Sequence, residues 1–190
     1  MSKHNKIICV LVVYTFLGFI IYSNTIGGKF LFDDNDTIVG NTYIRDFKHI
    51  KEIFTQDVTA GSGSIIGWYR PVLLLSYTVD YSIWQLSYYG YHLINILLQI
   101  FSSIVLFFIV FKLFNKIRTS FLSGLIFLIH PVQTEAVSYI SDRADLLLVF
   151  FLLISLLALQ FFMEVEDTRK RIILLSLSLG SFIVAPPPIY

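Results

Sequence analysis

The sequence contains apolar stretches, free of charged residues, that are long enough to cross a lipid bilayer. About 20 apolar residues in a helix span the hydrocarbon core, which is about 30 Å thick. Backbone polar groups in lipid must be satisfied within the segment, so these stretches are predicted to be helices. The fold class is therefore predicted to be all-α: a polytopic transmembrane helix bundle, residues 1–190 forming one membrane domain. Four spans are expected at residues 7–23, 92–113, 119–131 and 146–163, and a shorter fifth at residues 172–185.

Composition excludes several other classes of protein. The chain is 56% hydrophobic and 14% charged, whereas soluble domains carry about 25% charged residues. High hydrophobicity also excludes intrinsic disorder. The net charge of +1 offers no electrostatic attraction for nucleic acid. The single cysteine, Cys9, excludes an intrachain disulfide and a cysteine-based metal site.

The first span has two interpretations, a retained helix or a cleaved signal peptide. Lys3 and Lys6 precede it, as basic residues precede a signal sequence. Its apolar stretch, however, is longer than the 7–15 residues of a signal peptide, and no clear small-residue cleavage site follows. A retained helix is favoured.

The basic residues predict the orientation, since short cytoplasmic loops are enriched in lysine and arginine. If the spans alternate in direction, three basic segments fall on the same side of the membrane: the N-terminus, residues 112–118 and residues 169–171. This side is predicted to be cytoplasmic. Of the 13 acidic residues, 10 fall in residues 27–91 and 131–145 on the opposite, outer or lumenal side. The membrane is expected to be the plasma membrane in a bacterium or the endoplasmic reticulum in a eukaryote.

Residues 24–91 form the predicted outer loop. A short helix is expected at residues 47–54. Residues 69–84 have an amphipathic pattern with Pro71 in the first turn and tryptophans at both ends. This second helix is expected to lie along the membrane surface.

An acidic cluster at the start of this loop is the first candidate for chemistry. Asp33, Asp34 and Asp36 lie within four positions, and their mutual repulsion raises at least one pKa unless cations or hydrogen bonds compensate. Asp33 and Asp34 are candidate general bases, and Asp34 and Asp36 are candidate ligands for a divalent metal. A solvated acidic turn is the alternative.

Other polar residues are predicted at the same outer surface. Arg70 has the fork geometry that suits a phosphate, although it could equally anchor in the headgroups. His92 and His130 are expected at the outer ends of two spans, and Arg143 follows in the last outer segment. Asn95 and Gln99 continue a polar stripe below His92, for which hydrogen bonding between helices is the favoured reading.

Seven motifs in order extend these observations. The chain resembles the N-terminal part of polytopic membrane glycosyltransferases of the GT-C fold, and is most similar to the group with transmembrane helices and tetratricopeptide repeats, which is related to protein O-mannosyltransferases. The resemblance covers residues 30–162 and rests on Phe32-Asp33-Asp34, Asn41-Thr42-Tyr43-Ile44, Ile53-Phe54, Tyr69-Arg70-Pro71, Tyr91-His92-Leu93-Ile94-Asn95, His130 through Val137, and Ser141-Asp142-Arg143-Ala144-Asp145.

The resemblance implies an inverting transfer of a mannose-like hexose from a polyprenyl- or dolichyl-phosphate sugar to a protein or glycan hydroxyl. It implies a first-loop acid, Asp33 or Asp34 with Asp34 slightly preferred, as base or metal ligand, and a later outer motif containing His130 and Arg143. Phosphate binding by Arg70, His92, His130 and Arg143 is our expectation from their chemistry. The family's membrane domain is larger, so a truncated chain, inactive alone, is expected. The alternative function is a non-catalytic scaffold that binds lipid or a protein partner.

Overall fold

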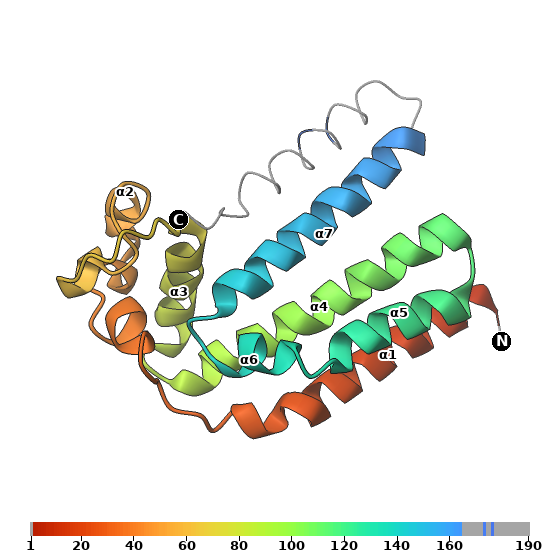
Figure 1. Cartoon of the computed structure of the whole chain (residues 1–190), viewed down its shortest axis with the longest axis horizontal. Coiled ribbons are helices and arrows are strands. Elements are labelled where there is room, and N and C mark those ends of the chain that lie inside the picture. The colour runs from red at the N-terminus through yellow and green to blue at the C-terminus, as the bar shows by residue number, and fades with distance from the viewer. Residues whose placement is uncertain (1, 165–172, 174–175, 177–190) are drawn as a thin grey trace.

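The computed structural model describes residues 2–164, 173 and 176, and these residues form helices and loops without a strand. This confirms the predicted all-α class. Figure 1 shows the long helices side by side, with the short helices gathered at one end. The α-helices of the described residues are α1 (Lys3–Tyr22), α2 (Ile50–Ile53), α3 (Pro71–Trp84), α4 (Tyr88–Phe114), α5 (Ile117–Ile129), α6 (Gln133–Ser138) and α7 (Arg143–Glu164).

Three helices among the described residues are long and apolar enough to cross a membrane: Lys3–Thr25, Tyr88–Phe114 and Arg143–Glu164. They correspond to the spans expected at residues 7–23, 92–113 and 146–163. The span expected at residues 119–131 is present as α5, but its 13 residues extend only about 20 Å, less than the hydrocarbon core. The expected fifth span falls almost wholly outside the described residues.

The short helix α5 ends because Pro131 follows it, and the residue before a proline avoids the helical conformation. His130 is accordingly extended, with ψ at 130°. Two carbonyls near this end accept hydrogen bonds from other helices. The Gln99 amide donates to the Phe127 carbonyl at 3.1 Å, and the Tyr22 hydroxyl donates to the Leu128 carbonyl at 2.8 Å.

Helix α4 is the centre of the bundle and packs against α1, α5 and α7. Its polar stripe is buried: His92, Asn95, Gln99, Ser102 and Ser103 are at most 2% exposed. Inside lipid such side chains must face protein or water. The predicted hydrogen bonding between helices is present, since the Asn95 amide donates to the Val137 carbonyl in α6 at 3.4 Å and the Gln99 amide donates to α5.

The two ends of the bundle differ in charge. At one end the Lys3 ammonium donates to the Asn115 side chain at 3.3 Å, and Lys112 pairs with Glu164. The N-terminus and the α4–α5 turn lie together at this end, and residues 24–91 lie at the other (Figure 1). This arrangement agrees with the alternation that the charge pattern predicts.

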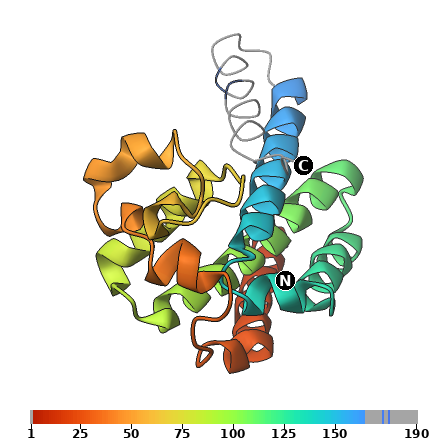
Figure 2. The same ribbon diagram turned by 60° about the vertical axis from the view of Figure 1, so that its left-hand side comes forward.

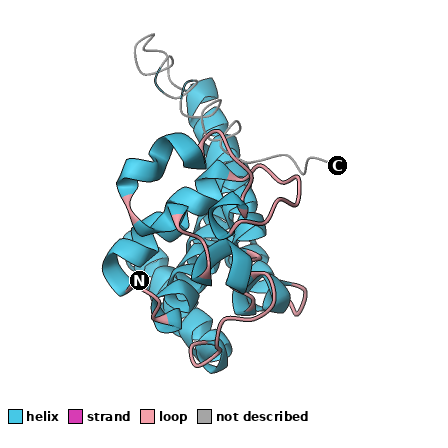
Figure 3. Cartoon of the chain, turned by 90° about the vertical axis from the view of Figure 1, so that its left-hand side faces the viewer, coloured by secondary structure: helices cyan, strands magenta, loops and turns pink. Residues whose placement is uncertain are grey.

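We call residues 24–91 the outer segment; Figure 3 looks onto it and shows its short helices joined by loops. The expected helix at residues 47–54 is a 3-10 turn, Phe47–His49, continued by α2. Helix α3 forms as predicted, but apolar residues lie on both of its sides: Leu73, Leu74 and Tyr77 are at most 1% exposed and pack on protein, whereas Val79 and Ile83 are exposed. It forms the core of the outer segment.

A buried ion pair connects the outer segment to the bundle. Arg143, the first residue of α7, is 0% exposed, and its Nη1 lies 2.5 Å from Oδ2 of Asp80 in α3. Its Nε donates to the Asn95 side chain at 2.7 Å, and its Nη2 donates to the Tyr91 carbonyl at 2.9 Å, both in α4. One guanidinium thus joins three helices.

Breaking this pair is expected to destabilise the fold strongly. Asp80→Asn leaves the buried guanidinium without its counter-charge, and such a loss costs about 3–5 kcal/mol. The free energy of unfolding, measured by denaturant titration in detergent micelles, is expected to fall by that amount. The control is Asp46→Asn, which breaks an exposed pair with Lys48 and is expected to change little. Equal stability of the two variants would contradict this role for the pair.

Candidate functional site

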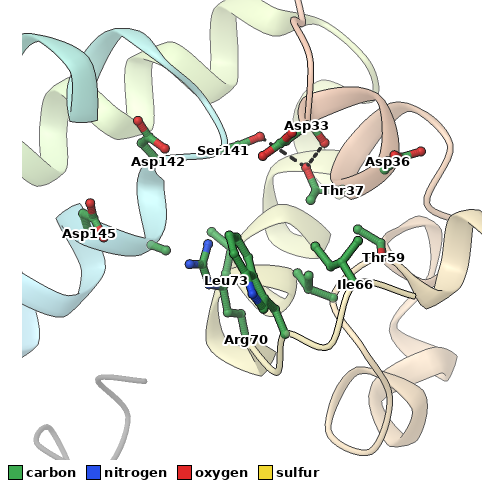
Figure 4. A pocket seen from close by; sticks show the side chains of 13 residues that line it. Asp33, Asp36, Thr37, Thr59, Ile66, Arg70, Leu73, Ser141, Asp142 and Asp145 are labelled. Carbon is green, nitrogen blue, oxygen red and sulfur yellow. Dashed lines mark hydrogen bonds between the residues drawn. The ribbon is translucent and has the colours of Figure 1, made fainter. Parts of the chain in front are cut away.

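A cleft of about 410 Å³ opens where the outer segment meets the start of α7. Three separate parts of the chain line it: residues 33–37, residues 58–73 and residues 141–145. Figure 4 shows carboxylates from the first and third parts around the opening, with one arginine among them. We call it the outer cleft; its polar lining includes Asp33, Asp36, Arg70, Ser141, Asp142 and Asp145.

Asp33 and Asp34, at the edge of the outer cleft, have different environments. Asp34 is 1% exposed; its carboxylate accepts a hydrogen bond from the Leu31 N–H at 2.8 Å and another from the Ser141 hydroxyl. Burial raises the pKa of Asp34, although these hydrogen bonds oppose the shift. Asp33 is exposed and lines the cleft. The tight turn before them holds Phe32 in the left-handed region, with φ at 43°.

Further hydrogen bonds hold the two distant segments together. The Asp33 N–H donates to the Tyr139 hydroxyl at 3.2 Å and joins the segments, while the Thr37 hydroxyl donates to the Asp33 carbonyl at 2.8 Å within the first segment. The Thr37 and Ser141 hydroxyl oxygens are 3.4 Å apart (Figure 4). The acidic start of the outer segment and the segment after Pro131 therefore meet in space.

Arg70 is the cation of the cleft among the described lining residues. Its guanidinium carbon lies 4.3 Å from the centroid of the Trp68 ring, and this stacking holds the side chain without occupying its hydrogen-bonding edge. Asp57 in turn holds Trp68 in place, because its carboxylate accepts a hydrogen bond from the Trp68 backbone N–H at 2.7 Å. No carboxylate of the described residues lies within ion-pair distance of Arg70.

The other expected phosphate ligands lie outside the cleft. Arg143 points into the protein, where Asp80 holds it, so the phosphate role expected for Arg143 lacks geometric support. His92 is 2% exposed, and its Nε2 donates to the Gly28 carbonyl at 2.9 Å. His130 is exposed, and its Nδ1 accepts the Val132 N–H at 3.2 Å. Of the four predicted residues, the structure brings only Arg70 to the cleft.

The expected metal ligands do not form a coordination site. The described residues contain no group of three or more His, Cys, Asp or Glu side chains that could hold a metal ion. Both carboxylate oxygens of Asp34 already accept hydrogen bonds, and Asp36 is exposed at the cleft. This donor set does not fit a divalent metal, so we assign it no chemical step.

Asp142 and Asp145 are cleft residues whose role the sequence did not reveal. They flank Arg143, but the arginine turns inward to Asp80 while both carboxylates line the cleft. Asp142 directly precedes α7 and Asp145 lies in its first turn, so their spacing of three residues was the available signal. Burial raises the pKa of Asp142 to about 6, with smaller contributions from the negative charges of Asp145 and Glu135.

Comparison with known proteins gives several related chains. A protein O-mannosyl-transferase of Caenorhabditis elegans, F38B6.6, is 31% identical over 153 residues, covering 77% of this chain and 22% of that protein. Human protein O-mannosyl-transferase TMTC2 is 35% identical over 150 residues, covering 74% and 17%. Human TMTC3 is 30% identical over 167 residues, covering 86% and 18%.

The chain spans about a fifth of the length of these curated relatives. No protein-family model and no solved structure matches it. The resemblance seen in the seven motifs thus extends over most of this chain, and the similar proteins come from organisms as distant as a nematode and human. Over most of its own length, this chain is a homologue of the TMTC protein O-mannosyl-transferases.

Proposed function

We propose that this chain forms the outer catalytic portion of a protein O-mannosyl-transferase that uses a dolichyl- or polyprenyl-phosphate mannose donor. The observation that carries the proposal is the outer cleft, which sets the carboxylate of Asp33 across from the guanidinium of Arg70 (Figure 4). The names of the homologues support mannose as the sugar and a protein hydroxyl as the acceptor.

The proposed reaction is a single displacement with inversion at the anomeric carbon. Asp33 takes the proton of a serine or threonine hydroxyl while that oxygen forms its bond to the sugar carbon. The bond from this carbon to the phosphate oxygen breaks, and its electron pair leaves with the lipid phosphate. Arg70 stabilises the charge on the leaving phosphate through charge-assisted hydrogen bonds. Inversion needs the base and the leaving group on opposite faces of the sugar, and Asp33 and Arg70 come from different segments that line the cleft.

The position of the cleft suits a donor with a lipid tail. It lies at the end of the bundle where α7 begins, so a phosphate at Arg70 would be near the ends of the membrane helices (Figure 1). We assign this end to the lumenal or outer face and the N-terminus to the cytoplasm, because the basic residues gather at the opposite end. In a eukaryote the membrane would be the endoplasmic reticulum.

The proposed base is tested by removing its charge. Asp33→Asn, made at the aligned carboxylate of a full-length homologue, is expected to lower mannose transfer to an acceptor peptide on the order of a hundredfold. Transfer is measured with radiolabelled dolichyl-phosphate mannose in membranes that contain equal amounts of each variant. The aligned Asp46→Asn change, at a residue that does not line the cleft, is the control. Normal transfer by the Asp33 variant would exclude this base.

The proposed phosphate ligand is tested by binding. Arg70→Ala is expected to weaken binding of a polyprenyl-phosphate sugar to this chain in detergent by about tenfold or more, because a charge-assisted hydrogen bond contributes about 1.5–3 kcal/mol. Arg70→Lys keeps the charge but loses the stacked fork and is expected to give an intermediate affinity. Lys48→Ala, an exposed change elsewhere, is expected to bind normally. Equal affinity of Arg70→Ala and the unchanged chain would contradict the assignment.

The carboxyl group of Asp142 is expected to make binding of the polyprenyl-phosphate sugar depend on pH. Its pKa is about 6, so the carboxyl is neutral below that pH and repels the phosphate anion above it. The donor's phosphodiester keeps one negative charge throughout, and affinity is therefore expected to fall as the pH rises through about 6. Asp142→Asn is expected to flatten this profile and to bind more tightly at neutral pH. A profile that keeps its midpoint in this variant would refute the role of Asp142.

A further inference from the structure

The outer segment carries an apolar stripe that its own core leaves uncovered. Phe47, Ile50 and Phe54 are each 45% exposed. They are spaced by three and four residues along the 3-10 turn and α2, a spacing that places side chains on one face of a helix. We call these three residues the 47–54 stripe.

The opposite face of the same short helix is fixed to the protein. Ile53 is 0% exposed and belongs to the core of the outer segment, together with Ile44. The helix therefore cannot turn its apolar stripe inward without pulling Ile53 out of that core. Two lysines accompany the stripe: Lys48, which pairs with exposed Asp46, and Lys51, which is exposed.

The place of α2 in the molecule indicates what covers the stripe. Figure 1 shows α2 beyond α3, off to one side of the bundle and at the end where α7 begins. In Figure 2 it again lies apart from the long helices. A bilayer crossed by α1, α4 and α7 has its outer surface near the start of α7. An element that extends sideways from this end extends over the lipid surface.

We propose that the 47–54 stripe docks on the outer surface of the bilayer that surrounds the bundle. Phenylalanine and isoleucine would enter the boundary between headgroups and acyl chains, where short amphipathic helices bind. Lys48 and Lys51 would meet lipid phosphates, as lysines beside such helices do. The apolar spacing, the fixed opposite face, the lysines and the sideways position all fit a lipid partner.

Docking would also position one wall of the outer cleft. The Tyr69 hydroxyl donates to the Phe54 carbonyl at 2.9 Å, and Tyr69 directly precedes the cleft residue Arg70. A stripe held at the lipid surface would hold this wall at the same depth. The docking itself concerns only how the outer segment lies on the bilayer, so it does not depend on the proposed sugar transfer.

The test measures the depth of single spin labels in the full chain. Cys9, which is exposed, is first changed to serine. A single new cysteine is then introduced by Ile50→Cys, Phe54→Cys or Lys51→Cys and carries the spin label. Each labelled chain is reconstituted in phosphatidylcholine vesicles. Collision rates are recorded with oxygen, which concentrates in lipid, and with a water-soluble nickel chelate. At positions 50 and 54 collisions with oxygen are expected to dominate. At the comparison position 51, which would lie at the level of the lipid phosphates in contact with water, collisions with the chelate are expected to dominate.

Two results would overturn the proposal. If labels at positions 50 and 54 meet the chelate as often as the label at position 51, the stripe faces water. If they are shielded from both reagents, protein covers the stripe. Each position replaces a partly exposed residue, and unchanged helix content by circular dichroism establishes that a variant is folded. Because two stripe positions are labelled separately, failure of one variant to fold leaves the other as the test.

Discussion

The ion pair between Arg143 and Asp80 is the interaction on which the outer half of the structure depends. A charged side chain buried without a partner costs several kcal/mol, so each group requires the other. Asp80 belongs to α3 and Arg143 to α7, and the Asn95 side chain and Tyr91 carbonyl on α4 complete the set of acceptors. These contacts fix the rotation of α7 about its own axis. Asp142 and Asp145 consequently face the outer cleft.

A second junction completes the cleft from the other side. The Ser141 hydroxyl donates to the buried carboxylate of Asp34, although the two residues are 107 positions apart. With Asp34 held in the protein, its neighbour Asp33 lies at the cleft edge. A pair of adjacent carboxylates thus divides into one that joins segments and one that is free to react. Asp34 contributes to the proposed chemistry by positioning Asp33.

The polar residues inside the bundle have a structural role of their own. Gln99 and Tyr22 donate to carbonyls near the end of α5, where Pro131 stops the helix. A helix end in lipid needs such partners because no water is present to supply them. The bundle can therefore hold the short α5 beside three longer helices. The segment that follows α5 includes α6 and leads to Ser141 and Asp142, which line the cleft.

The sequence alone determined the helical class, the three long spans, the charge difference between the two ends and the resemblance to O-mannosyl-transferases. These follow from local properties: uncharged apolar length, the positions of lysines and arginines, and ordered motifs. Tertiary structure decided which polar residues face the cleft. Arg143 is buried while its neighbour Asp142 lines the cleft, because Asp80 pairs with the arginine. Asp34 is buried while its neighbour Asp33 lines the cleft, because Ser141 donates a hydrogen bond to Asp34. Those partners lie more than sixty residues away in the chain, and no local pattern reveals them.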